Sequence, residues 1–337
     1  MSRDPAVKRL APALLATLLL GLAAGLVAGP QGFSPTAFWQ DLQGEQAGLI
    51  LGQIRAPRSL GALAVGALLG LAGAVAQGLF RNPLADPYLL GTAAGAGLAV
   101  VLVMATASAG GFTLSLATLA WIERVGLVGA AFVGALGGMA LTLSLAAGAV
   151  NTLRLLLAGV VVAVVLGAAS DLVTTFSPDA LRGKQAFMLG STSFLGWDAV
   201  LLLTGGALLL LVAAGRLARL LDALTLGEDS ATSLGLDLPR LRLRLVLLLA
   251  AATALAVSQV GLVGFVGLVA PHLVKRLAPG PHGPLLWLSA GMGAALLLWA
   301  DVLSRTLIAP QELPVGVVTS VLGGVYLCVL IRQRGLR

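Results

Sequence analysis

Few side chains in this sequence could break or form covalent bonds. The two histidines, His272 and His282, lie ten residues apart beside prolines, with no HExxH motif and no Cys–His set. Cys328 is the only cysteine, which excludes a disulfide framework and a cysteine metal site. The Gly183–Lys184 pair lacks the upstream glycine of a phosphate-binding loop, because a proline stands there. We therefore expect no enzyme activity, cofactor or metal site, and any ATP hydrolysis must reside on a separate subunit.

Acidic residues inside apolar segments would indicate a proton or ion relay. Asp171, Asp198 and Asp301 all fall near the predicted outer ends of such segments rather than at their centres. This placement weakens the interpretation of the chain as an ion-coupled transporter that works without ATP, but it does not exclude that interpretation. Asp301 and Arg305 are four residues apart, so a local helical ion pair worth about 0.2–0.5 kcal/mol is the simplest expectation for them.

The stretch RAPRSL, residues 55–60, combines a proline with two arginines. Pro57 suits the first turn of a helix. Arg55 and Arg58 are three residues apart and share one helix face. They could simply extend to the lipid–water interface. Together with Arg305, however, they lie on the predicted outer side against the general charge bias, which favours a binding surface.

The stretch QGLFRNPLADPYLLG, residues 77–91, contains two prolines within five residues. They stop the preceding helix and require an extended inner turn. Asn82 and Asp86 can accept hydrogen bonds from the freed backbone. A structural turn is the simplest interpretation, but non-helical backbone at membrane depth usually lines a cavity or gate.

The stretch TLGEDSATSLGLDL, residues 225–238, is a short acidic segment between two apolar blocks. Thr225 or Gly227 can cap a helix that carries Glu228 and Asp229 in its first turn, and Gly235 can end it. Both acids are expected to be surface residues whose removal costs little stability. The simplest interpretation of this segment is an ordinary solvated loop helix.

The elements that must position these residues are membrane helices. The chain has 337 residues, of which 58% are hydrophobic and 10% charged, whereas a soluble domain averages about 25% charged residues. Several uncharged runs reach the roughly 20 residues that a membrane helix needs. The first apolar run follows several basic residues and could be a signal peptide. Its length, and the apolar runs that follow it, favour a helix that is not cleaved off. We expect spans at 11–30, 59–80, 88–107, 122–148, 153–173, 195–215, 241–258, 260–276, 284–304 and 314–332.

The arginine and lysine residues orient these spans. Residues 245–274 form one uncharged run, which we divide at the glycines of GLVGFVG so that the basic loop 216–244 and the basic C-terminal end lie on the same side. With ten spans and both termini cytoplasmic, fifteen Lys and Arg residues fall inside and six outside, as the positive-inside rule requires. The net charge of +7 is thus explained by topology, and no nucleic-acid partner is expected.

Four stretches together resemble one family. They are RAPRSLGALAVGALLGLAGAVAQGLFRNPLADPYLLG, GLVGFVGLVAPHLVKR, ADVLSR and ELPVGVVTSVLGG. In this order they are similar to the permease subunits of type II ATP-binding-cassette importers, which take up ferric siderophores, haem and cobalamin. The likeness runs from about residue 50 to 330, and the C-terminal GGVYLCVLIRQ departs from the usual pattern. The resemblance implies a single all-α permease domain over 1–337, with about ten spans, in the inner (plasma) membrane.

The resemblance also implies partners and site residues. The partners are a second copy of the chain, two ATPase subunits below and one substrate-binding protein above. A cytoplasmic coupling segment at about 216–240 would dock on the ATPase. A membrane-embedded enzyme is disfavoured, because no catalytic constellation is present. The implied site residues are Arg55, Arg58 and Arg305 for docking of the binding protein, Asn82, Leu84, Asn151 and Thr152 for the cytoplasmic gate, and Leu226, Gly227, Glu228, Ala231, Leu234 and Gly235 for coupling.

Overall fold

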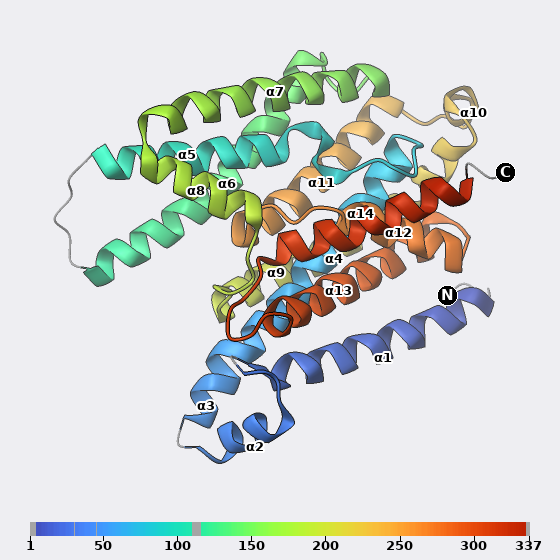
Figure 1. Ribbon diagram of the computed structural model, residues 1–337. Helices are drawn as coiled ribbons and strands as arrows, with labels where there is room; N and C mark the ends of the chain where they lie inside the picture. Colours follow the sequence, from blue (N-terminus) through green and yellow to red (C-terminus); the bar gives the residue numbers. More distant parts are fainter. Residues whose placement is uncertain (1–4, 30, 45, 110–115, 335–337) are drawn as a thin grey trace.

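The computed structural model describes residues 5–29, 31–44, 46–109 and 116–334, which form a bundle of helices (Figure 1). The elements that correspond to the ten predicted spans are α1 (Pro5–Val27), the continuous run α3 (Ala47–Leu49), η1 (Ile50–Arg55) and α4 (Ala56–Leu79), α5 (Thr92–Ala109), α6 (Leu116–Leu145), α7 (Thr152–Phe176), α9 (Trp197–Thr225), α11 (Leu238–Val260), α12 (Val266–Leu277), α13 (His282–Thr306) and α14 (Val315–Arg334).

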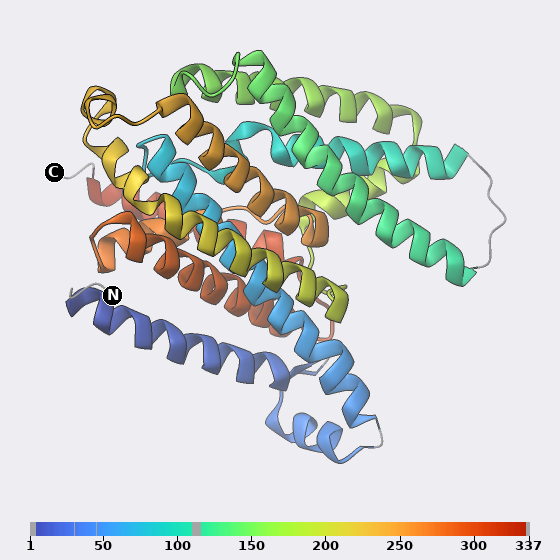
Figure 2. The same cartoon turned by 180° about the vertical axis from the view of Figure 1, so that it is seen from behind.

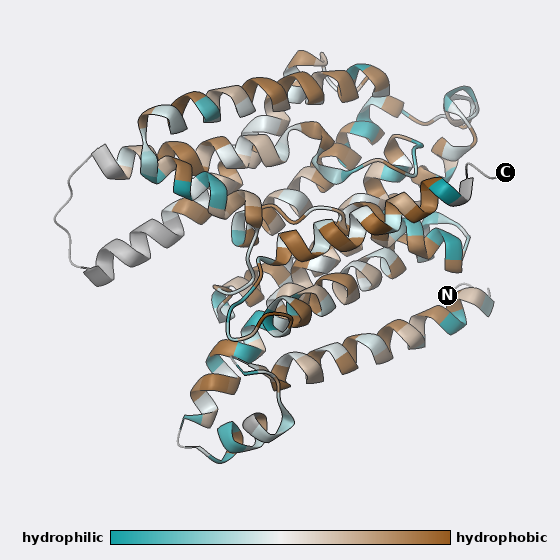
Figure 3. Cartoon of the chain, in the orientation of Figure 1, coloured by the Kyte–Doolittle hydropathy of each residue, from teal (hydrophilic) through white to brown (hydrophobic). Residues whose placement is uncertain are grey.

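Eight of these helices in the described part of the chain are long and apolar enough to cross a membrane. The remaining two predicted spans are shorter: the apolar part of α5 covers Thr92–Ala107, and α12 has 12 residues. The prediction of an all-α, multi-pass membrane protein is therefore confirmed, with a count of ten that is approximate. Figure 3 shows hydrophobic residues along the lengths of the long helices and hydrophilic residues gathered toward the ends of the bundle.

Several smaller elements were not predicted. They are the antiparallel pair β1 (Ala28–Gly29) and β2 (Gly32–Phe33), the helices α2 (Pro35–Gln43) and α8 (Pro178–Leu189), and the 3-10 turn η2 (Pro87–Leu90). The predicted start of the second span at residue 59 was wrong, because the helix already begins at Ala47. Pro57 lies inside this run, two residues after the end of the π-helical segment η1. A proline has no N–H to donate, and a local widening of the helix accommodates that loss.

The division of the long uncharged run 245–274 is confirmed. Helix α11 ends at Val260, and Gly261 follows with a φ of 70°. Helix α12 begins at Val266, after Phe265 with a φ of 66°. Positive φ at Gly261 carries no steric penalty, since glycine lacks a Cβ atom. The turn between Val260 and Val266 therefore divides the uncharged run into two helices, α11 and α12.

Helix α4 runs through the middle of the bundle and is buried along nearly its whole length (Figure 1). Its glycines let neighbouring backbones approach closely. A Cβ atom on Gly66 would lie 2.3 Å from the carbonyl oxygen of Gly293 in α13, and one on Gly73 would lie 1.6 Å from that of Gly267 in α12. Helices α5 and α6 meet in the same way at Gly95 and Gly134. Glycines at these contacts therefore allow tight helix packing.

The two ends of the bundle differ in what they carry. Helix α1 lies along one edge and α5 to α8 form the opposite side, with α4 between them (Figures 1 and 2). The start of α1, the end of α14 and the short helix α10 (Glu228–Ser233) lie at the same end. Helices α2 and α3 lie at the other end. Each end holds one group of polar side chains.

Candidate functional site

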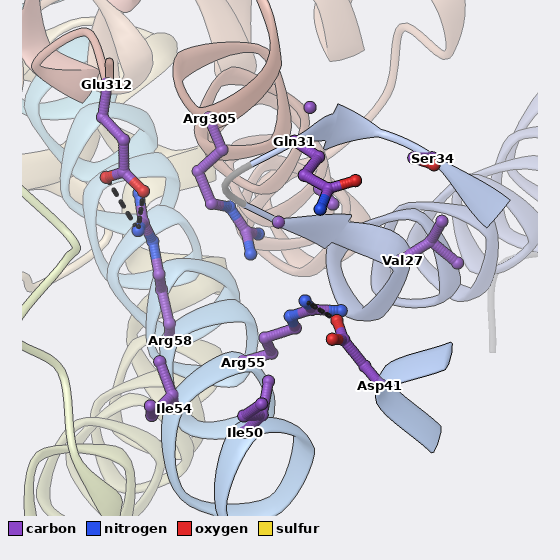
Figure 4. Close-up of a pocket in the computed structure, with 13 residues that line it drawn as sticks. Val27, Gln31, Ser34, Asp41, Ile50, Ile54, Arg55, Arg58, Arg305 and Glu312 are labelled. Atoms are coloured by element: carbon purple, nitrogen blue, oxygen red, sulfur yellow. Dashed lines mark hydrogen bonds and ion pairs between the residues drawn. The ribbon is translucent and has the colours of Figure 1, made fainter. Parts of the chain in front are cut away.

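The three arginines predicted for docking meet at the end of the bundle that carries α2 and α3. Arg55 is the last residue of η1, Arg58 lies in the first turn of α4, and Arg305 lies in the last turn of α13. All three line one cavity of about 310 Å³, which Asp41 and Glu312 also line (Figure 4). Helices far apart in the sequence thus bring these cations to one place.

Asp301 stands at the centre of this group. Its side chain is fully buried, and its Oδ1 accepts hydrogen bonds from Arg58 Nε at 2.9 Å and Thr192 Oγ1 at 2.5 Å. Its Oδ2 lies 2.6 Å from Arg305 Nη2. The expected pair between Asp301 and Arg305 is therefore present. The pair is not an isolated local one, because the same buried carboxylate also binds the buried guanidinium group of Arg58.

The arginines also contact carboxylates closer to the surface. Arg58 Nη1 donates to both carboxylate oxygens of Glu312 at 2.9 Å. Arg55 Nη2 lies 2.5 Å from Asp41 Oδ2, and its Nη1 donates to the carbonyl of Leu26 at 2.9 Å. The side chains of Glu312 and Asp41 are 42% and 31% exposed, whereas all three arginines are buried. Arg55 and Arg58 are thus buried but paired with acids that are partly exposed. Docking of a binding protein by the three arginines stays a prediction.

The second polar group lies at the α10 end. Asn82, Asn151 and Thr152, predicted for a gate, line one cavity of about 310 Å³ together with Glu228. Two stretches 69 residues apart, at 82 and 151, thus face each other across this cavity. Leu84 is not among its lining residues, and its side chain is exposed. A gate role for these residues stays a prediction.

The backbone around this cavity is fixed by side-chain caps. Asn82 Oδ1 accepts from the Leu84 N–H at 2.9 Å. Asp86 Oδ1 accepts from the Tyr88 N–H at 2.8 Å, as expected for a turn that prolines have opened. Burial raises the pKa of Asp86 above its usual value, and the Tyr88 N–H opposes part of that rise. Asn151 caps α7 by accepting from the Leu153 and Arg154 N–H groups.

Helix α10 begins and ends as the sequence predicted. Gly227 is its N-cap with a φ of 103°, and Glu228 and Asp229 occupy its first turn. At the other end Gly235 has a φ of 78°, its N–H bonds to Thr232, and the Leu236 N–H bonds to the carbonyl of Ala231. These two bonds form a Schellman motif, which closes a helix at a glycine.

The two faces of this short helix differ. Ala231 is fully buried against α9 and α11 residues, while Leu226 and Leu234 on either side of the helix are 67% and 65% exposed. A short helix that anchors one small residue and presents two leucines to solvent is suited to contact another protein. Its role in coupling stays a prediction.

Both acids of α10 are exposed, as expected, but Glu228 also forms two ion pairs that the sequence did not predict. Its Oε1 lies 2.6 Å from Arg242 Nη2 and 3.3 Å from Arg81 Nη2. Arg242 belongs to α11 and is buried, and its Nη1 also donates to the carbonyl of Val150. The residue pattern did not reveal Arg242, because it resembles the other basic residues near the ends of predicted spans. An arginine at the start of an apolar helix, fourteen residues after a glutamate, was the available signal.

Comparison with known proteins shows which family the chain belongs to. Residues 15–333 match the model of the FecCD transport family. The chain is 39% identical to the hemin transport system permease protein HmuU of Yersinia pestis, over 98% of this chain and 97% of that one. It is 35% identical to the vitamin B12 import system permease protein BtuC of Klebsiella pneumoniae, over 96% and 92%.

A probable siderophore transport system permease protein, YfhA of Bacillus subtilis, is 38% identical over 84% of this chain and 81% of its own length. Among solved structures, an inward-facing metal-chelate type ABC transporter superposes with a TM-score of 0.82 at 27% identity, covering 97% of this chain and 99% of that one. The described fold is therefore that of an ABC importer permease. The chain belongs to the FecCD transport family, as a multi-pass membrane permease.

Proposed function

We propose that this chain is the membrane subunit of an ATP-driven importer that moves a metal chelate or a corrinoid into the cytoplasm. The observation that carries the proposal is the separation of two polar sites by one helix. Arg58 lies in the first turn of α4 and Arg81 follows its end. The 21 helical steps from Arg58 to Leu79 span about 32 Å, close to the hydrocarbon thickness of about 30 Å. Each site thus faces a different aqueous compartment.

The α10 end is the proposed cytoplasmic end. It holds α10, the start of α1 and the end of α14 (Figure 1), and basic residues gather there, among them Arg242, Lys275, Arg276 and Arg332. Cytoplasmic ends of spans carry an excess of lysine and arginine. Both termini are therefore cytoplasmic in this proposal, and the importer lies in the inner (plasma) membrane.

The partner at this end is an ATPase subunit. The chain has no nucleotide-binding loop of its own, so energy must come from another protein. The exposed leucines beside α10, Leu226 and Leu234, offer an apolar contact at an otherwise polar surface. Residues Gly227, Glu228, Ala231 and Gly235 shape the helix that presents them.

The partner at the opposite end is a substrate-binding protein with carboxylates on its surface. Arg55, Arg58 and Arg305 form a cationic group whose only surface-facing counter-charges among the described residues are Asp41 and Glu312. Carboxylates of a partner would exchange with these two acids. Such contacts chiefly set association rate and its dependence on salt.

The cargo is proposed from the relatives, whose names give hemin, vitamin B12 and siderophores. Identities of 35–39% to these three do not separate one cargo from another. We place the pathway for the cargo between two copies of the chain, and the cavities lined by the arginines and by the gate residues measure about 310 Å³ each. That volume is at the low end for drug-sized ligands. Two permease copies and two ATPase subunits complete the proposed assembly.

Co-purification tests this proposal. The chain is expressed with its own tag in a host that also expresses a candidate ATPase subunit, extracted in mild detergent, and analysed for bound subunits and for mass. A complex with two copies of each subunit is the expected result. A chain that purifies alone and transports a solute along an ion gradient would favour the ion-coupled alternative.

A further inference from the structure

We infer that Glu228 is a positioning residue that links the ATPase-contacting helix α10 to both loops of the cytoplasmic gate. The inference rests on the proposed function and adds to it a route from the ATPase to the gate. The carboxylate of Glu228 contacts two arginines, Arg81 and Arg242, and lines the same cavity as Asn82, Asn151 and Thr152. Among the described residues that line this cavity, Glu228 is the only acidic one.

The first connection runs through Arg242. This guanidinium group is buried on α11 and divides its donors between two acceptors: Nη2 contacts Glu228 at 2.6 Å, and Nη1 donates to the Val150 carbonyl. Val150 directly precedes Asn151, the N-cap of α7 and the start of one gate loop. A displacement of Glu228 therefore acts, through one rigid planar group, on the backbone where α7 begins.

The second connection runs through Arg81. Its Nη2 lies 3.3 Å from the same Glu228 oxygen, and Arg81 directly precedes Asn82 in the other gate loop. Arg81 has a φ of 48°, in the left-handed region that a residue with a Cβ rarely adopts. The pair is about half exposed on both sides, so it is the weaker of the two connections.

The position of α10 itself does not depend on these pairs. Ala231 packs into the apolar cluster formed by α9 and α11, and the Schellman motif closes the C-terminal end. Asp229, the neighbouring acid in the same first turn, has an exposed side chain and no ion pair within the described residues. Charge at the helix start would be satisfied by either acid. Complementing the helix dipole therefore does not explain why Glu228 contacts two arginines.

The test uses the complex of this chain with its ATPase subunit, reconstituted in lipid nanodiscs. Asn82→Cys and Thr152→Cys are introduced separately in a Cys328→Ser background, because the native cysteine is exposed. The rate of maleimide labelling at each position is measured with and without bound nucleotide. Glu228→Gln is compared with Asp229→Asn as the matched control, which removes one negative charge from the same helix turn.

In the parent complex, nucleotide should change the labelling rate by about fivefold or more, a typical size for coupling between two sites. Glu228→Gln should bring this ratio close to one in complexes that retain the ATPase subunit. Asp229→Asn should leave the ratio as in the parent. An unchanged ratio in Glu228→Gln, or equal losses in both variants, would overturn the inference. Loss of the ATPase subunit from Glu228→Gln alone would do so too, since Glu228 would then act in docking.

Arg81→Gln supplies a second measurement that does not disturb the buried pair. Arg81 is half exposed, so the variant should fold, and it should reduce the nucleotide-dependent ratio only in part. A ratio in Arg81→Gln as high as in the parent would contradict a connection through Arg81. A parent chain that binds no ATPase subunit at all would instead refute the proposed function, and this inference with it.

Discussion

Asp301→Asn removes a single charge and almost no volume from the centre of the arginine group. The parent carboxylate has no exposed surface and accepts from Arg58, Arg305 and Thr192. Asparagine keeps one acceptor oxygen but presents N–H donors to the second guanidinium group. Arg58 keeps both contacts with Glu312. Arg305 loses its only ion-pair partner among the described residues.

The magnitude follows from this asymmetry. Breaking a buried pair by removing one partner costs about 3–5 kcal/mol, and one arginine, rather than two, is left without a counter-charge. We therefore expect a loss of about 3 kcal/mol, at the low end of that range. At an unfolding entropy of about 2.1 cal/mol/K per residue, each kcal/mol lowers the melting temperature of a 337-residue chain by about 1.4 °C. The expected decrease is then about 4 °C.

The assay is thermal unfolding of the purified permease in detergent, followed by aggregation or tryptophan fluorescence, with Glu312→Gln as the matched control. Glu312 is 42% exposed, and pairs of exposed charges contribute only about 0–1 kcal/mol. The control should therefore melt within about 1 °C of the parent. Equal melting temperatures for Asp301→Asn and Glu312→Gln would refute the argument that Asp301 compensates buried charge.

Three further predictions concern the packing and the two partner surfaces. Gly73→Ala should destabilise the permease strongly, because the added Cβ atom would lie 1.6 Å from the Gly267 carbonyl oxygen, and the melting temperature reports it. Leu234→Ser should weaken co-purification of the ATPase subunit without lowering the melting temperature, because this leucine is 65% exposed. Glu312→Gln should speed association of the binding protein at low salt, since it releases the Arg58 donors, and surface-plasmon resonance measures that rate.

Each of these predictions has a contrary outcome. Gly205→Ala is the matched control for the glycine, because a Cβ atom there meets nothing within 4 Å, and equal effects of the two alanines would contradict close packing as the cause. A Leu234→Ser variant that retains the ATPase at parental affinity would remove the leucine from the contact. An association rate that is the same with and without Glu312→Gln at every salt concentration would argue against docking through Arg58.

Hydropathy and helix-capping residues predicted the features that depend on neighbours in sequence. The uncharged runs located the long helices, and the glycines after Val260 located the turn between α11 and α12. The bounds of α10 followed from Gly227 and Gly235, because each must adopt positive φ. Helices α2 and α8 escaped prediction, since both are short and polar enough to read as loops.

Features that depend on distant residues could not be predicted in the same way. Arg58 and Asp301 are separated by 243 positions, and Arg81 and Glu228 by 147. No local periodicity connects such residues. The types and spacing of residues therefore indicated which arginines are unusual. They did not indicate that these arginines are paired within the chain, or that the residues predicted for a gate share one cavity with Glu228 of α10.

The most direct test of the central claim is uptake into proteoliposomes that contain the permease and its ATPase subunit, with the binding protein outside. Hemin, cobalamin and a ferric siderophore are offered separately, with ATP or a non-hydrolysable analogue enclosed. The account predicts accumulation of one of these compounds that requires both ATP hydrolysis and the binding protein. Accumulation driven by an ion gradient, and indifferent to ATP and to the ATPase subunit, would contradict it.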